Sequence, residues 1–392
     1  MKVLLVNDYG TRDGGAEIAT LLLRDGLRRL GHDVLLFTSA AHAAGTVTEA
    51  DVSCYGTTRE SRTLLQTANL SARRGLGRVL ADFQPDVVHV GLFLTQLSPL
   101  ILPLLRDVPS VYHAHWLRAI CPTGSKLLPD ESACTHPVGR ACWRSGCLPL
   151  HDWLPLMGQM HLWRRWRGVF DRVVANSDAT RTALEAEGFA NVVVIPCGVA
   201  PASARAAFAD VPTVLCSGRL TRQKGVHVLL DAWRTIARKI PGARLIIAGD
   251  GPERAELERV APAGATFLGA VPHDELHEIA RGAWIQVVPS VGVEGFGLVA
   301  VEAMMRGSAV VATRAGGLPE VVEHDVTGRL TEAGDRDDLA ATVIAMLRDR
   351  RLCEQMGERG RRIAEERYGD GLYVERFVAL YETMLAEHRR PT

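Results

Sequence analysis

Residues 214–240 read VLCSGRLTRQKGVHVLLDAWRTIARKI, and this stretch decides the fold. Its first part, Val214–Ser217, is a short apolar run typical of a buried strand, and its last part, Val226–Ile240, has helical periodicity. The loop between them carries Arg219 and Lys224. A strand, a loop and a helix in this order open a βαβ unit, whose loop lies at the carboxyl edge of a parallel sheet.

The same alternation continues in both directions from this stretch. Runs rich in Val, Ile and Leu fit parallel strands that helices cover on both faces. The sequence therefore predicts the α/β class, with doubly wound sheets, and the series is long enough for two of them. The other predicted strands are Val3–Val6, Asp33–Thr38, Val87–Val90, Ser110–His113, Val173–Asn176, Val192–Pro196, Leu245–Gly249, Ile285–Pro289 and Ala309–Thr313, and a further helix is Ala16–Leu30.

The length of 392 residues favours two domains. Residues 199–211 lack strong periodicity and carry Pro201, which suggests a boundary there. We expect residues 1–199 to form an N-terminal domain and residues 200–371 a C-terminal domain. The C-terminal helix, 372–392, is expected to return to the first domain.

Composition limits the function classes. The 45 Lys and Arg residues balance the 45 Asp and Glu residues, so no net charge points to nucleic acid. The apolar run Val3–Val6 is too short for the core of a signal peptide, and no stretch is long enough to span a bilayer. We expect a cytoplasmic protein, with peripheral contact at the inner membrane face left open.

The C-terminal half carries two cations and two carboxylates at characteristic spacing. Arg219 and Lys224 lie in a strand-to-helix loop near a helix N-terminus, where a diphosphate would bind. Glu294 and Glu302 are separated by seven residues, and a carboxylate accepts hydrogen bonds from sugar and ribose hydroxyls. A solvated basic turn and a structural helix glutamate are the plain alternatives.

Glycines frame these charges. Gly295, Phe296, Gly297 and Leu298 join a strand to a helix, so their backbone amides are placed to face a phosphate. The run from Gly295 to Ala300 also matches the dinucleotide fingerprint G-x-G-x-x-G/A, but it comes late in its domain. No G-x-x-x-x-G-K-[ST] loop is present, which argues against a nucleoside triphosphatase.

The N-terminal half offers two smaller signals. Gly14 and Gly15 lie between the first strand and the first helix, where the backbone can approach a ligand, although a plain tight turn fits as well. His113 and His115 end a predicted strand and, being two apart, should lie on the same face.

Taken in order, these motifs resemble glycosyltransferase family 4, the retaining nucleotide-sugar transferases with the GT-B fold. The resemblance covers nearly the whole chain, and the E-x7-E pair with the Arg and Lys pair is its most specific part. It rests on Gly14–Glu17, Gly31–Val34, His115 with Cys121-Pro122, Asn176-Ser177, Ile195–Val199, Gly218-Arg219, Lys224-Gly225, Ala248–Pro252, Pro289-Ser290, Glu294, Glu302 and Gly316–Glu320.

The resemblance implies two Rossmann-like domains that face a central cleft, with residues 1–199 as the acceptor-side domain and residues 200–371 as the donor-binding domain. It also implies roles for matching residues. Arg219 and Lys224 would bind the diphosphate in place of a divalent metal, Glu302 the ribose, and Glu294 the sugar hydroxyls near the anomeric carbon. His115 would contact the sugar from the other domain. The implied donor-binding set is Gly15, Arg219, Lys224, Gly251, Glu294, Gly295, Phe296, Gly297, Leu298 and Glu302, and the implied catalytic set is Glu294, His115, Arg219 and Lys224. The chain departs from the family pattern at Trp116 and Cys197.

Four cysteines fall close together in the N-terminal half, at Cys121, Cys134, Cys142 and Cys147. Four thiols at this density match a tetrahedral structural zinc site, although no C-x2-C pair is present. The alternative is an acceptor-side loop with reduced cysteines, as expected in a reducing compartment.

An aromatic and basic segment follows, with Trp153, Trp163 and Trp166 among arginines. Such a segment fits an amphipathic helix on an anionic membrane. It also fits a core helix with a solvated basic face, which we favour.

The sequence thus predicts a retaining hexosyltransferase that uses a UDP- or GDP-linked sugar and serves the biosynthesis of a glycan, a glycolipid or a glycosylated metabolite. The acceptor is a saccharide, a lipid-linked saccharide or a small molecule. The alternatives are a hydrolysing nucleotide-sugar 2-epimerase and a non-catalytic nucleotide-sugar-binding protein. No cofactor is expected beyond a structural zinc.

Overall fold

A computed structural model describes residues 1–12, 14–42, 46–59, 62–202 and 207–388. The chain forms two compact units, one of Met1–Gly198 with Asp370–Thr392 and one of Val199–Gly369. The sequence had placed the boundaries at 199/200 and 371/372, and residues 203–206 of the expected linker lie outside the described part. None of the described helices is long and apolar enough to cross a membrane.

The first unit is built on a seven-stranded parallel sheet with the order β3-β2-β1-β4-β5-β6-β7. The order reverses between β1 and β4, which places the switch point of a doubly wound sheet there. Its strands are β1 (Lys2–Val6), β2 (Asp33–Ser39), β3 (Val52–Cys54), β4 (Val87–Val90), β5 (Ser110–Ala114), β6 (Arg172–Ala175) and β7 (Val192–Val194).

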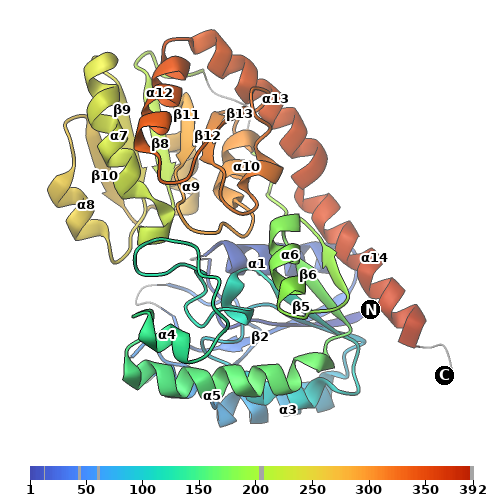
Figure 1. Cartoon of the computed structure of the whole chain (residues 1–392). Helices are drawn as coiled ribbons and strands as arrows, with labels where there is room; N and C mark the ends of the chain where they lie inside the picture. Colours follow the sequence, from blue (N-terminus) through green and yellow to red (C-terminus); the bar gives the residue numbers. More distant parts are fainter. Residues whose placement is uncertain (13, 43–45, 60–61, 203–206, 389–392) are drawn as a thin grey trace. The chain divides into compact units, whose positions relative to one another are not determined.

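Helices cover both faces of this sheet (Figure 1). In β1, Val3 and Leu5 join one core with α1 and α14, while Leu4 and Val6 join another with α3, η1 and α5. This alternation is the period of two of a strand, and it explains why β1 is apolar throughout. The helices are α1 (Gly15–Arg29), α2 (Arg62–Leu65), α3 (Leu70–Phe83), η1 (Pro99–Leu105), η2 (Leu117–Ala119), α4 (Arg140–Arg144), α5 (Leu150–Trp166), η3 (Arg167–Val169), α6 (Asp178–Ala186) and α14 (Asp370–His388).

The second unit repeats the same architecture with a six-stranded parallel sheet, in the order β10-β9-β8-β11-β12-β13. Here the order reverses between β8 and β11, so these two neighbouring strands flank the switch point. The strands are β8 (Thr213–Ser217), β9 (Arg244–Ala248), β10 (Ala265–Gly269), β11 (Ile285–Val288), β12 (Ala309–Thr313) and β13 (Gly328–Thr331).

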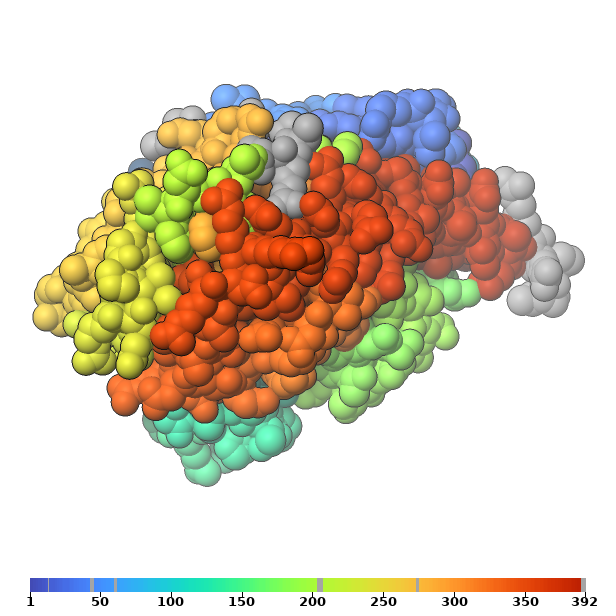
Figure 2. All heavy atoms as spheres, turned by 90° about the horizontal axis from the view of Figure 1, so that it is seen from above, coloured from blue at the N-terminus to red at the C-terminus, as the bar shows by residue number. Residues whose placement is uncertain are grey.

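One face of the second sheet packs on α7, α12 and the start of α13, around the buried Trp233 and Met346. Figure 2 shows α12 and α13, in orange-red, on the surface of this unit. The helices are η4 (Arg222–Lys224), α7 (Val226–Lys239), α8 (Arg254–Val260), α9 (His273–Ala280), α10 (Leu298–Met305), α11 (Leu318–Val321), α12 (Arg336–Leu347) and α13 (Arg350–Tyr368).

All ten predicted strands are present, and β3, β10 and β13 were missed. Each missed strand is the outermost of its sheet. Their sequences, VSC, ATFLG and GRLT, are short or interrupted by Ser, Thr, Gly or Arg, so they lack the continuous apolar run that identified the others. The doubly wound α/β fold is confirmed for each unit.

Candidate active site

In the second unit, the predicted site residues lie in loops that follow β9, β8 and β11 and on α10. These three strands are adjacent in the sheet, so their carboxyl ends meet at one edge. Backbone hydrogen bonds join the loops: Leu220 N donates to Asp250 O at 2.8 Å, and Val291 N donates to Gln223 O at 3.0 Å. Gly251 lies in the same edge, and its N–H donates to Asp250 Oδ1 at 2.7 Å.

The centre of this edge is an ion pair between Lys224 and Glu294. Lys224 Nζ lies 2.7 Å from Glu294 Oε1 and 2.8 Å from Oε2, and Ser290 Oγ donates to Oε2 at 2.8 Å. The side chains are 33% and 16% exposed, so the pair is open to a ligand. Burial alone would raise the pKa of Glu294, but the charge of Lys224 and the hydrogen bonds from Lys224 and Ser290 hold that pKa below its ordinary value.

Two glycines allow the loops to come this close. Gly225 has φ +68°, and a Cβ there would overlap the carbonyl oxygen of Pro289. Gly316 has φ +56°, and a Cβ there would overlap the backbone of Glu294, to which Gly317 N donates at 2.8 Å. Only glycine fits both the conformation and the space at these positions. The residues that fix the Lys224–Glu294 geometry therefore include glycines on two separate loops.

The loop after β8 also holds polar groups that sequence reasoning missed. Ser217 Oγ and Thr221 Oγ1 are buried and have no hydrogen-bond partner among the described residues. Buried hydroxyls are normally satisfied, so two partnerless ones beside a cation indicate a surface shaped for a polar ligand. Arg219 lies between them in sequence, is exposed, and makes no ion pair within the described chain.

The start of α10 brings the predicted Gly295–Leu298 stretch to the same edge. Gly297 caps the helix with φ +102°. The ring of Phe296 is buried and packs against Tyr368 at 5.5 Å between centroids, so only the backbone of Phe296 is left to meet a ligand. Glu302 lies one turn into α10 and is partly buried, and its charge opposes the effect of burial on the pKa of Arg306. Glu302 thus has a charged protein neighbour, Arg306, and the role of Glu302 in binding ribose stays a prediction.

In the first unit, histidines line the carboxyl ends of β4 and β5. Tyr381 Oη lies 2.7 Å from His89 Nδ1, His89 Nε2 lies 3.2 Å from His113 Nδ1, and His113 Nε2 lies 2.6 Å from Asn176 Oδ1. Burial lowers the pKa of His89 well below its ordinary value and that of His113 to about 4. Both imidazoles are therefore neutral, and the Asn176 acceptor fixes the direction in which each group of this row donates.

His115 follows this row at the edge of the sheet. Its ring lies 3.9 Å from that of His113, which confirms that the two share a face. Burial, with smaller contributions from His113 and His89, lowers the pKa of His115 well below its ordinary value. Its Nε2 atom is buried and has no hydrogen-bond partner among the described residues. A neutral imidazole with one free nitrogen suits a sugar hydroxyl better than a phosphate.

The edge of the first unit also contains Asp8 and Gly15. Asp8, which sequence reasoning missed, accepts hydrogen bonds from the backbone of Thr95, Gln96 and Leu97, and burial raises its pKa. It organises the loop after β4. Gly15 is exposed and is the first residue of α1.

The four clustered cysteines converge on one small pocket of the first unit, together with His136. All four thiols are free. Burial raises the pKa of Cys147, and the other three cysteines raise it further. Among the described residues, however, no group of three or more His, Cys, Asp or Glu side chains is arranged so that it could hold a metal ion. The zinc prediction gains no support from this geometry, and metal analysis of the purified protein would test it.

The tryptophans of the aromatic and basic segment belong to α5. Trp163 is fully buried and donates to Ala119 O at 2.8 Å, and Trp153 donates to Gly139 O at 2.9 Å. These contacts show that one face of α5 packs into the core, while Arg164 and Arg165 stay exposed. Trp116, a departure from the family pattern, is half-buried, with the Arg118 guanidinium 5.8 Å from its ring centroid.

Comparison with known families decides the relationship. Residues 13–203 match the family model described as Glycosyltransferase Family 4, and residues 203–363 match the one described as Glycosyl transferases group 1. The chain belongs to glycosyltransferase family 4. The two matches meet at residue 203, close to the division between the two compact units.

Relatives and solved structures fit this family. A GDP-mannose-dependent alpha-(1-6)-phosphatidylinositol monomannoside mannosyltransferase of Mycobacterium tuberculosis is 36% identical over 161 residues, which is 38% of this chain and 42% of that protein. The match thus spans less than half of the relative's length. Sucrose-phosphate synthase of Thermosynechococcus elongatus has a TM-score of 0.75 at 20% identity, covering 99% of this chain and 100% of that one. Anabaena HepE in complex with UDP and glucose has a TM-score of 0.70 at 22% identity, with 98% and 100% covered. These two likenesses show the GT-B fold.

Proposed function

We propose that the chain is a retaining glycosyltransferase that moves a hexosyl unit from a UDP- or GDP-linked sugar to an acceptor hydroxyl. The observation that carries the proposal is the Lys224–Glu294 pair at the switch point of the second sheet. A cation for phosphate and a carboxylate for hydroxyls meet there, beside the buried hydroxyls of Ser217 and Thr221. Both donor bases stay open, because one relative is named for GDP-mannose and one fold neighbour contains UDP.

In this proposal the residues divide the work by charge. Lys224 exchanges Glu294 for the diphosphate when the donor binds, and the exposed Arg219 adds a second cation. Glu294, freed from Lys224, accepts hydrogen bonds from the sugar hydroxyls. His115 offers a sugar hydroxyl a neutral hydrogen-bonding partner.

The proposed reaction is a substitution that retains the configuration of the anomeric carbon. The bond between the anomeric carbon and the β-phosphate oxygen breaks, and the acceptor oxygen forms its bond on the same face of the sugar. The acceptor proton passes to the departing phosphate oxygen. The positive charges of Lys224 and Arg219 stabilise the diphosphate as its negative charge develops.

The test is a panel of UDP-, GDP- and ADP-sugars incubated with the purified protein, followed by measurement of the nucleoside diphosphate released by slow donor hydrolysis. Release from one donor, lost in Lys224→Ala and Glu294→Ala, supports the proposal and identifies the donor. An epimerised sugar released with the diphosphate would establish the 2-epimerase instead. Tight donor binding without release, even when a mixture of saccharide and lipid-linked acceptors is added, would establish a binding protein.

A further inference from the structure

The helices on one face of the first sheet form a strongly basic layer, which consists of α2, α3, α4 and α5. Together these four helices contain eight arginines and two aspartates, with no lysine and no glutamate. The chain as a whole is neutral. A surplus of six positive charges is therefore concentrated on one layer of one unit.

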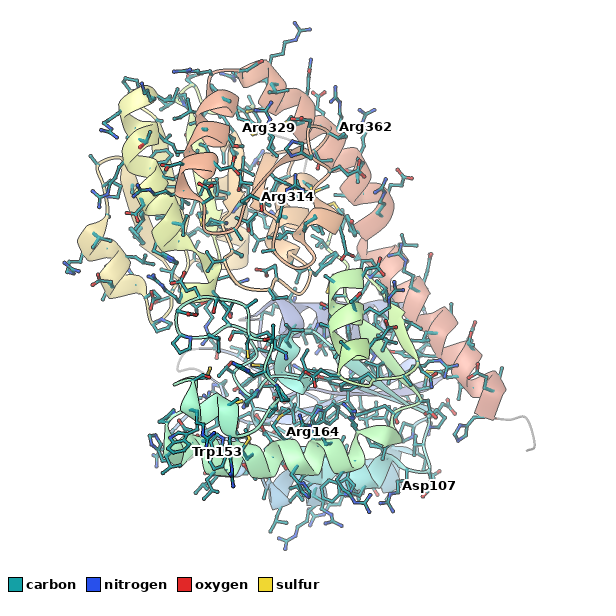
Figure 3. The ribbon with its side chains drawn as sticks, viewed as in Figure 1. Asp107, Trp153, Arg164, Arg314, Arg329 and Arg362 are labelled. Carbon is teal, nitrogen blue, oxygen red and sulfur yellow. The ribbon has the colours of Figure 1, made fainter. Side chains whose placement is uncertain are left out.

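The solvent face of α5 can be read from its buried face. Its buried residues are Leu156, Gln159, Met160 and Trp163. At 100° per residue, the opposite side carries Leu150, Leu154, His161 and Arg165 in one stripe. All four are exposed, and Figure 3 marks Trp153 near the start of this helix and Arg164 near its end. The stripe therefore begins with leucines and ends with positive charge.

The neighbouring helices extend the same surface. Both α3 and α5 pack against η1, so their solvent faces lie on the same side of the sheet (Figure 1). Of the large apolar side chains that are exposed in the described part, α3 contributes Leu70 (56%), α2 contributes Leu64 (68%) and α4 contributes Trp143 (45%), beside Leu150 (58%) and Leu154 (68%) on α5. The ring centroids of Trp143 and Trp153 are 6.4 Å apart, so α4 packs against α5.

Most arginines of the basic layer make no ion pair with a described residue. Seven of them make no ion pair with any described residue: Arg73, Arg74, Arg78, Arg140, Arg144, Arg164 and Arg165. On the opposite face of the same sheet, Arg24, Arg28 and Arg29 of α1 all pair with carboxylates. The unpaired arginines are consequently available to an anionic partner.

We propose that the basic layer docks the protein on an anionic lipid surface. A bilayer uses both parts of the layer, because arginines meet the lipid phosphates while leucines and a tryptophan enter the boundary between headgroups and acyl chains. Nucleic acid would meet the arginines but would leave the leucines in water. A second copy of this layer would be repelled by its charge. Docking does not depend on the proposed glycosyl transfer, so either proposal can fail alone.

The experiment is sedimentation of the full chain with phosphatidylcholine vesicles that contain or lack phosphatidylglycerol. We expect binding only to the anionic vesicles, weakening as salt rises. The double variant Arg164→Glu/Arg165→Glu should weaken binding at least about tenfold. Leu150→Ser/Leu154→Ser should weaken vesicle binding but leave the salt dependence of that binding unchanged. The matched control, Arg359→Glu/Arg362→Glu on the exposed face of α13, should bind like the native protein.

Equal unfolding midpoints for all the variants will show that they are folded. Failure of the native protein to bind anionic vesicles would overturn the proposal, as would equal binding by all the variants. Vesicle binding that RNA abolishes and that the leucine substitutions leave unchanged would establish a nucleic-acid surface instead. Concentration-dependent dimers that the arginine variant dissolves would establish an interface between copies.

Discussion

The two units present opposite kinds of polar group at the carboxyl edges of their sheets. The second unit holds a charged pair, Lys224 and Glu294, which is open enough for a ligand to enter. The first holds a row of buried, neutral groups from Tyr381 to Asn176, with His115 beside it. The same doubly wound fold thus builds a charged edge and a neutral edge. A charged edge suits a diphosphate, and a neutral edge suits uncharged hydroxyls.

Lys224→Ala should have the largest effect, because it removes the cation at the centre of the charged edge. We expect kcat/KM for the donor to fall about 100- to 1000-fold. Initial rates of transfer or donor hydrolysis measure it, with Lys239→Ala on the exposed end of α7 as the control. A loss of less than threefold would mean that the charged edge is not the diphosphate site.

Mild acid should destabilise the first unit before it destabilises the second. The pKa values of His89, His113 and His115 are lower in the folded state, so the unfolded chain binds more protons and stability falls as the pH drops below about 6.5. Each histidine contributes a slope of about 1.4 kcal/mol per pH unit. Glu294 has the same sign of linkage in a more acidic window: its lowered pKa gives stability that is complete above the ordinary glutamate value and is lost only as pH falls through the folded pKa.

Hydrogen exchange between about pH 7.5 and 5.5, corrected for its intrinsic pH dependence, measures the local stability of each unit. Amides of β5 should lose protection, while those of β8 and β11 should keep it. Equal loss in both units would show that the neutral row does not set the acid response.

Glu294→Gln should lower the rate of transfer without weakening the binding of the nucleoside diphosphate. The amide keeps the shape of the side chain but removes the charge that holds Lys224, so UDP or GDP should bind at least as tightly as to the native protein. Transfer should fall about 10- to 100-fold, because the charge-assisted hydrogen bonds to the sugar are weakened. Calorimetry with the diphosphate and initial rates with the donor make the comparison. Weaker diphosphate binding would contradict the exchange of partners proposed for Lys224.

His115→Ala should have the smallest effect, about a tenfold loss in kcat/KM, because it removes one hydrogen bond between neutral groups. Diphosphate binding should not change, since the role proposed for His115 is a hydrogen bond to a sugar hydroxyl. His388→Ala, at the exposed end of α14, is the control. A parallel loss of diphosphate affinity in His115→Ala would place the histidine at the phosphate.

Much of the second unit could be read from the chain. Buried central strands, strand-to-helix loops with glycine, and the spacing of Glu294 and Glu302 all have local signatures. The edge strands β3, β10 and β13 lack such a signature because polar residues and glycine interrupt their apolar positions. The partnerless hydroxyls of Ser217 and Thr221 could not be predicted either, since common residue types give no sign of their burial.

The fold class, the family and the residue types of the candidate site can be recognised from the sequence, because strand and helix periods and loop glycines are local properties. Which of these residues come into contact depends on the tertiary structure. Lys224 and Glu294 are seventy residues apart, and Tyr381 and His89 are 292 apart. Sheet order brings the first pair together, and the return of α14 brings the second. Contacts at such separation depend on how strands are ordered and helices are packed, which no local pattern encodes.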